Sequence, residues 1–116
     1  MAKDKSLDLS VVIPVHNEEG NIEYFYKELK DALNFSRSYE IIFVDDGSRD
    51  SSFMILSRIA SEDKNVRAVK LRGNYGQTIA IRAGLDISKG EKIIPILGGI
   101  STKGTIKEDK KNEPKL

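Results

Sequence analysis

The chain has 116 residues, of which 39% are hydrophobic and 32% are charged, so we expect one soluble globular domain with its own core. A formal net charge of +1 gives no overall attraction to nucleic acid or to an anionic membrane, and we expect no nucleic-acid partner. The absence of cysteine excludes disulfides and thiolate zinc sites. No signal peptide and no apolar run of about 18 residues is recognisable, which favours a cytoplasmic protein.

Apolar runs and helical spacings alternate along the chain. Runs rich in Val, Ile and Leu predict buried strands, and apolar residues three or four positions apart predict helices. In chain order the pattern predicts a strand at 8–15, a helix at 18–34, a strand at 39–48, a helix at 51–63, a strand at 65–72, a helix at 76–90 and a strand at 91–97. Pro95 within the last strand indicates an edge strand or a strand end.

This alternation is typical of βαβ units, and it predicts an α/β fold whose parallel strands are covered by helices on both faces. We assign residues 1–97 to this domain. Residues 98–116 contain five Lys, three acidic residues and no sustained period, so we expect a polar, largely disordered tail. The edge that the last strand leaves open predicts self-association.

A histidine and several acidic residues follow the first two predicted strands. His16, Glu18 and Glu19 come after the first strand, and Asp45 and Asp46 end the apolar run of the second. Ligands of open α/β sheets bind outside the carboxyl ends of the strands, so neighbouring strands would bring these side chains to one crevice. Carboxylates only accept hydrogen bonds, which suits the N–H and O–H groups of a base edge and a ribose. They repel phosphates unless a metal intervenes.

Structural explanations remain open for the same residues. The two glutamates could complement a helix N-terminus capped by Asn17, and the DDGS stretch could be a turn before a helix capped by Asp50. Lys70 and Arg72, near the end of the third predicted strand, either serve phosphates or balance the acidic cluster. The phosphate loops GxGxxG and GxxxxGK[ST] are both absent from the sequence.

Three stretches, LSVVIPVHNEEGNI, YEIIFVDDGSRDSS and VKLRGNYGQTIAIRAGLDISKGEKII, together resemble family 2 glycosyltransferases of the type A fold. The resemblance covers about residues 8–95, and it is greatest to the branch that transfers a sugar to dolichol or undecaprenyl phosphate. It implies a Rossmann-like open parallel sheet in the order 3-2-1-4, the N-terminal half of that fold. It also implies that five residues recognise the base and ribose of a nucleotide: Pro14, His16, Glu18, Val44 and Asp46. Asn74 and Gln77 match a further family signature without a defined role.

The resemblance ends where the family carries an Asp-x-Asp motif after its fourth strand. In the family these carboxylates hold the Mg²⁺ or Mn²⁺ that clamps the diphosphate. The corresponding stretch here reads Leu97-Gly98-Gly99, so we assign no metal ligand. The family also continues well beyond the length of this chain, and we therefore expect a truncated product that is inactive alone.

The activity that the resemblance implies is transfer of a hexose from a GDP- or UDP-sugar to a polyprenyl-phosphate-type acceptor, at the cytoplasmic face of a membrane. The alternative is a non-catalytic nucleotide- or nucleotide-sugar-binding module. A phospho-acceptor receiver domain also places paired aspartates at a strand end. It needs a third aspartate and a lysine at later strand ends, whereas the fourth predicted strand ends in Leu97 and Gly98.

Overall fold

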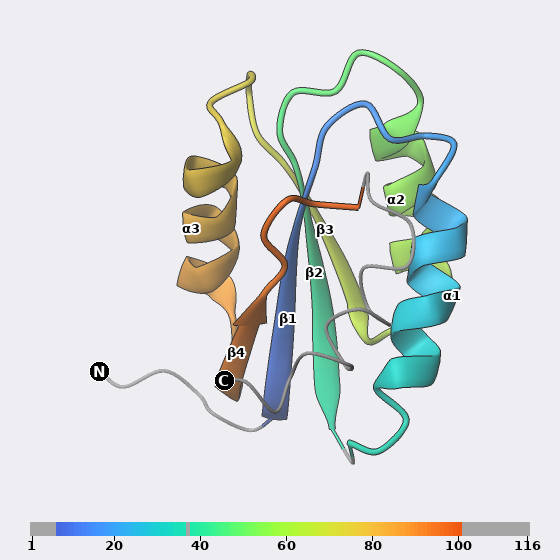
Figure 1. The fold of residues 1–116 in the computed structure, drawn as a ribbon, viewed down its shortest axis with the longest axis vertical. Coiled ribbons are helices and arrows are strands. Elements are labelled where there is room, and N and C mark those ends of the chain that lie inside the picture. Colours follow the sequence, from blue (N-terminus) through green and yellow to red (C-terminus); the bar gives the residue numbers. More distant parts are fainter. Residues whose placement is uncertain (1–6, 37, 101–116) are drawn as a thin grey trace.

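Strands and helices alternate along the chain in the computed structural model, which describes residues 7–36 and 38–100 (Figure 1). The order is β1 (Leu7–Val15), α1 (Ile22–Ala32), β2 (Tyr39–Asp45), α2 (Ser52–Glu62), β3 (Val66–Lys70), α3 (Gln77–Ile87) and β4 (Gly90–Pro95). Every predicted strand and helix is therefore confirmed. All but the first strand are shorter than predicted.

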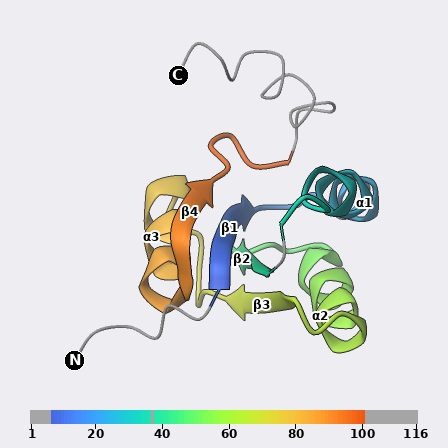
Figure 2. The same ribbon diagram turned by 90° about the horizontal axis from the view of Figure 1, so that it is seen from below.

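The four strands form one parallel sheet in the order β3-β2-β1-β4, which confirms the expected order. Val11 of β1 lies opposite Ile41 of β2 on one side and Ile94 of β4 on the other. Helices α1 and α2 cover one face of the sheet and α3 covers the other (Figure 2). This arrangement follows from right-handed crossovers, because the chain moves outward from β1 to β3 and then returns across the sheet to β4.

Strand β2 contributes alternate side chains to two separate parts of the core. Ile41 and Phe43 are fully buried on the side of α1 and α2. Ile42 and Val44 are fully buried on the side of α3, where they pack with Ala80. A strand buried on both faces needs an uninterrupted apolar run, and this explains the sequence YEIIFV.

Gly84 allows helix α3 to lie close to the sheet. A Cβ atom at this position would be 2.4 Å from Cγ1 of Val12 and 3.2 Å from Cγ2 of Val44. The close approach places the first turn of α3 beside the carboxyl ends of β1 and β2, where the candidate site lies.

The segment after β4 begins with a turn at residues 97–100, and Ile100 then packs in the core on the side of α1 and α2, with 2% of its surface exposed. The expected disordered tail starts at residue 98, and its residues 101–116 lie outside the described part of the chain. Within the described residues, no helix is both long enough and apolar enough to cross a membrane.

Candidate functional site

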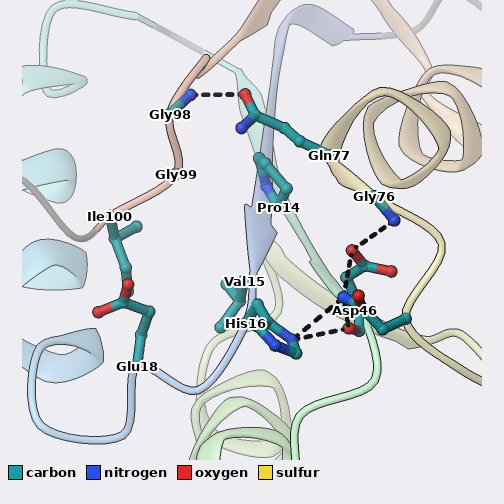
Figure 3. A pocket seen from close by; sticks show the side chains of 11 residues that line it. Pro14, Val15, His16, Glu18, Asp46, Gly76, Gln77, Gly98, Gly99 and Ile100 are labelled. Carbon is teal, nitrogen blue, oxygen red and sulfur yellow. Dashed lines mark hydrogen bonds between the residues drawn. The ribbon is translucent and has the colours of Figure 1, made fainter.

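A pocket of about 240 Å³ lies at the carboxyl ends of β1, β2 and β4. It opens where the strand order reverses, because the chain leaves β1 toward β2 but reaches β4 on the opposite side of β1. Figure 3 shows its lining, which comes from all three strand ends and from the start of α3. The lining residues are Pro14, Val15, His16, Glu18, Asp46, Asn74, Gly76, Gln77, Gly98, Gly99 and Ile100.

The carboxylate of Asp46 holds the loop that precedes α3. Its Oδ1 atom accepts the backbone N–H of Tyr75 at 2.8 Å, and its Oδ2 atom accepts the N–H of Gly76 at 3.0 Å. The side-chain amide of Asn74 donates to the same Oδ2 atom at 3.1 Å. Asp46 is 4% exposed, so this carboxylate replaces water with three protein donors and fixes one wall of the pocket.

His16 is oriented by the backbone of Asp46. Its Nδ1 atom lies 2.9 Å from the carbonyl oxygen of Asp46, and Asn74 donates to the same oxygen at 3.0 Å. A carbonyl oxygen only accepts, so Nδ1 carries the proton in this arrangement. The Nε2 atom then accepts from the side-chain amide of Asn17 at 3.2 Å. The ring is exposed at the pocket.

Asn17 and Glu18 join the loop after β1 to the loop after β2. Asn17 has a positive φ of 52°, donates its N–H to Oγ of Ser48 at 2.8 Å, and accepts the N–H of Arg49 at 2.8 Å. Glu18 donates its N–H to Oγ of Ser52 at 2.8 Å. The alternative that Asn17 caps the first helix is wrong. Helix α1 begins at Ile22, and the side chain of Asn17 is hydrogen-bonded to the loop after β2.

The N-cap of α2 is Ser51, so the cap expected at Asp50 is wrong, although Asp50 accepts hydrogen bonds in the turn before the helix. Its Oδ1 atom accepts the N–H of Ser52 at 2.8 Å, and its Oδ2 atom accepts the N–H of Glu19 at 3.3 Å. Burial acts to raise the pKa of Asp50, but the hydrogen bonds from Ser52 and Glu19 outweigh it and hold the pKa below its usual value. Asp50 therefore has a structural role outside the pocket.

Four of the five residues expected to recognise a nucleotide line this pocket: Pro14, His16, Glu18 and Asp46. Val44 is fully buried beneath it, in the core on the side of α3, and is not part of the lining. Neither Lys70 nor Arg72 lines the pocket. The ammonium group of Lys70 lies 5.3 Å from the ring centre of Phe53, on α2.

The model of the family described as "Glycosyl transferase family 2" matches residues 10–97. The chain belongs to this family.

Two curated relatives illustrate the membership. The undecaprenyl-phosphate 4-deoxy-4-formamido-L-arabinose transferase of Pseudomonas aeruginosa is 44% identical over 97 residues, which are 81% of this chain and 29% of that protein. The glycosyltransferase sll0501 of Synechocystis, named as uncharacterized, is 38% identical over 92 residues, which are 78% of this chain and 29% of that protein. The chain thus spans about 29% of the length of these relatives.

Solved structures of S. aureus TarS 1-349 share the fold. The complex with UDP matches with a TM-score of 0.69 and 24% identity, over 78% of this chain and 27% of that chain. The complex with UDP-GlcNAc matches with a TM-score of 0.64 and 22% identity, over 94% of this chain and 32% of that chain. The expected type A glycosyltransferase fold is therefore confirmed.

Within this family 2 domain, the backbone of residues 98–100 forms the rim of the pocket on the side opposite His16. The side-chain oxygen of Gln77 accepts the N–H of Gly98 at 2.5 Å, which ties α3 to the turn after β4 (Figure 3). Gly98 and Gly99 both have positive φ, at 84° and 66°. This conformation favours glycine, and it turns the chain so that Ile100 enters the core. The adjacent glycines were visible in the sequence, but the buried Ile100 was not expected.

Among the described residues, those that line the pocket do not fit a divalent cation. Mg²⁺ and Mn²⁺ prefer several oxygen ligands with carboxylates among them. The described residues contain no group of three or more His, Cys, Asp or Glu side chains that could hold a metal ion. In the pocket, the oxygens of Asp46 already accept three N–H groups, and an oxygen of Glu18 accepts the amide of Asn21 at 2.8 Å.

Proposed function

We propose that this pocket binds the nucleoside part of a nucleotide-sugar. The observation that supports the proposal is the meeting of Pro14, His16, Glu18 and Asp46 in one pocket at the switch point of the sheet. The Oε1 atom of Glu18 accepts from Asn21, and its other oxygen has no hydrogen bond among the described residues. That second oxygen is suited to accept an N–H of a base or an O–H of ribose.

We further propose the donor and acceptor classes of the reaction to which this domain contributes. A GDP- or UDP-sugar is the donor, and the TarS complexes with UDP and UDP-GlcNAc support the inclusion of uridine nucleotides. A polyprenyl phosphate is the acceptor, supported by the named activity of the P. aeruginosa relative. Such a lipid would bring the reaction to the cytoplasmic face of a membrane. An acceptor phosphate oxygen can attack directly, so the reaction needs no strong general base.

The chain by itself is proposed to bind without transferring sugar. Departure of the diphosphate needs its developing charge to be stabilised, and the pocket offers neither a metal site nor a lysine or arginine. The alternative, a non-catalytic nucleotide- or nucleotide-sugar-binding module, predicts the same result for this chain, namely binding without sugar transfer. The assay is purified chain with radiolabelled UDP-glucose or GDP-mannose, polyprenyl phosphate and Mn²⁺. Lipid-linked label above a control without protein would contradict the proposal.

Nucleotide binding is tested by calorimetry with UDP and GDP on matched variants. We expect dissociation constants between high micromolar and millimolar, or about 4–6 kcal/mol. Glu18→Gln should weaken binding by about 1–2 kcal/mol, because a hydrogen bond to a charged acceptor becomes one to a neutral acceptor. Glu19→Gln is the control, because Glu19 does not line the pocket. Equal losses in the two variants, or no binding of either nucleotide, would overturn the proposal.

A further inference from the structure

We infer that this pocket recognises the nucleoside alone, without a divalent cation and without strong contacts to the diphosphate. The inference rests on the proposed nucleotide binding and departs from the metal clamp that the family resemblance implies. Three features of the structure carry it: the state of the pocket's carboxylates, the construction of the rim formed by residues 98–100, and the charge around the pocket.

The first feature is that most of the acceptor capacity of the Asp46 carboxylate is already used within the protein. Its two oxygens accept hydrogen bonds from Asn74, Tyr75 and Gly76. A cation bound to Asp46 would compete with these donors and release the loop that forms a wall of the pocket. Glu18 remains as the second carboxylate of the lining, and a single carboxylate with one oxygen already bonded is a poor site for Mg²⁺.

The second feature is that the rim at residues 98–100 is fixed by packing and hydrogen bonds. Gly98 donates to Gln77, Gly99 donates to the carbonyl of Ile96 at 3.4 Å, and Ile100 is anchored in the core. A Cβ atom at Gly99 would lie 3.0 Å from the carbonyl oxygen of Pro14. The backbone at this rim therefore lies against β1, and its glycines provide no side-chain oxygen for a metal.

The third feature is the charge that a diphosphate would meet. The lining contains the carboxylates of Glu18 and Asp46 and no lysine or arginine. A diphosphate near these groups gains no attraction from the pocket, because no cation offsets the like charges. The free energy of binding then comes from the base and ribose, and addition of phosphates to the nucleoside leaves the affinity unchanged or lowers it.

Calorimetry on the full chain tests this inference with uridine and UDP, and in parallel with guanosine and GDP. Each ligand is titrated in EDTA and again in Mn²⁺, with the heat of Mn²⁺–nucleotide association in buffer subtracted. We expect the nucleoside to bind at least as tightly as its diphosphate, and Mn²⁺ to change either affinity by less than about threefold.

The possible outcomes separate this inference from the proposed function. A diphosphate that binds more than about threefold tighter than its nucleoside, in EDTA or only with Mn²⁺, overturns the inference and leaves nucleotide binding intact. Failure of every nucleoside and nucleotide to bind overturns both. As a second measurement, the Asp46 side of the pocket is followed through the amide signals of Tyr75 and Gly76 by NMR. Broadening of these signals by Mn²⁺ with UDP, in excess of that with Mn²⁺ alone, would also contradict the inference.

Discussion

The side-chain oxygen of Gln77 accepts a hydrogen bond from the backbone N–H of Gly98, with 2.5 Å between the two atoms. The bond joins the first residue of α3 to the turn after β4, although 21 residues separate them in the sequence. Because Gln77 and Gly98 both line the pocket, this contact sets the separation between two of its walls.

Replacement of Gln77 by Leu should loosen the turn without unfolding the domain. The side chain of Gln77 is exposed, so the variant loses an acceptor but little packing. We expect the Gly98 amide to exchange with solvent about tenfold faster, as measured by NMR hydrogen exchange. Gln77→Glu keeps the acceptor oxygen and serves as the control. Unchanged exchange at Gly98 in the Leu variant would contradict the role of the bond.

Glu40 should make the stability of the fold depend on acidic pH. Burial acts to raise the pKa of its carboxyl, but hydrogen bonds from Ser10, Lys89 and Arg67 and the charge of Arg67 outweigh it, so the pKa lies below the usual value of 4.5. The ionised form therefore stabilises the fold above that pH. This stabilisation is lost as the pH falls through the folded pKa.

The variant Glu40→Gln tests this dependence by urea unfolding at several pH values. We expect it to be about 1–3 kcal/mol less stable than the wild type at neutral pH, because charged hydrogen bonds in a buried site are weakened. Its stability should fall less steeply between neutral pH and about pH 3. Glu91→Gln, at an exposed position of β4, is the control. Parallel pH profiles for wild type and Glu40→Gln would refute the assignment.

An alanine at Gly84 should separate α3 from the sheet. The new methyl group would overlap the side chain of Val12, and we expect a loss of about 1–3 kcal/mol in the free energy of unfolding despite the better helix propensity of Ala. Gly20→Ala is a matched control, because a Cβ atom there would meet nothing within 4 Å. The prediction fails if both variants unfold at the same urea concentration as the wild type.

Strand β4 should support weak self-association. It is an outer strand of the described sheet, and the side chain of Ile94 is 44% exposed on it. Sedimentation velocity should show an average mass that rises with protein concentration, and Ile94→Lys should reduce this rise. Met54→Lys, at a residue 72% exposed on α2, should leave the association unchanged. A monomer at all concentrations would contradict this prediction.

The positions of the pocket residues could be predicted in large part because the carboxyl ends of parallel strands share one edge of the sheet. His16 and Glu18 follow β1 and Asp46 follows β2, so the order of the strands alone brings them together. Val44 does not line the pocket, because alternate residues of a strand face opposite sides and its side chain enters the core beneath. Binding of a nucleotide by these residues stays a prediction.

The sequence by itself determined the alternation of strands and helices, since hydrophobic periodicity is a local property of the chain. Only the tertiary structure decided what the polar residues do. Asp46 holds the loop before α3, Asn17 joins two loops instead of capping a helix, and Gln77 fixes the turn after β4. These hydrogen bonds connect residues about 20 to 30 positions apart, and the chemistry of a single residue type does not specify which of several distant donors or acceptors it will meet.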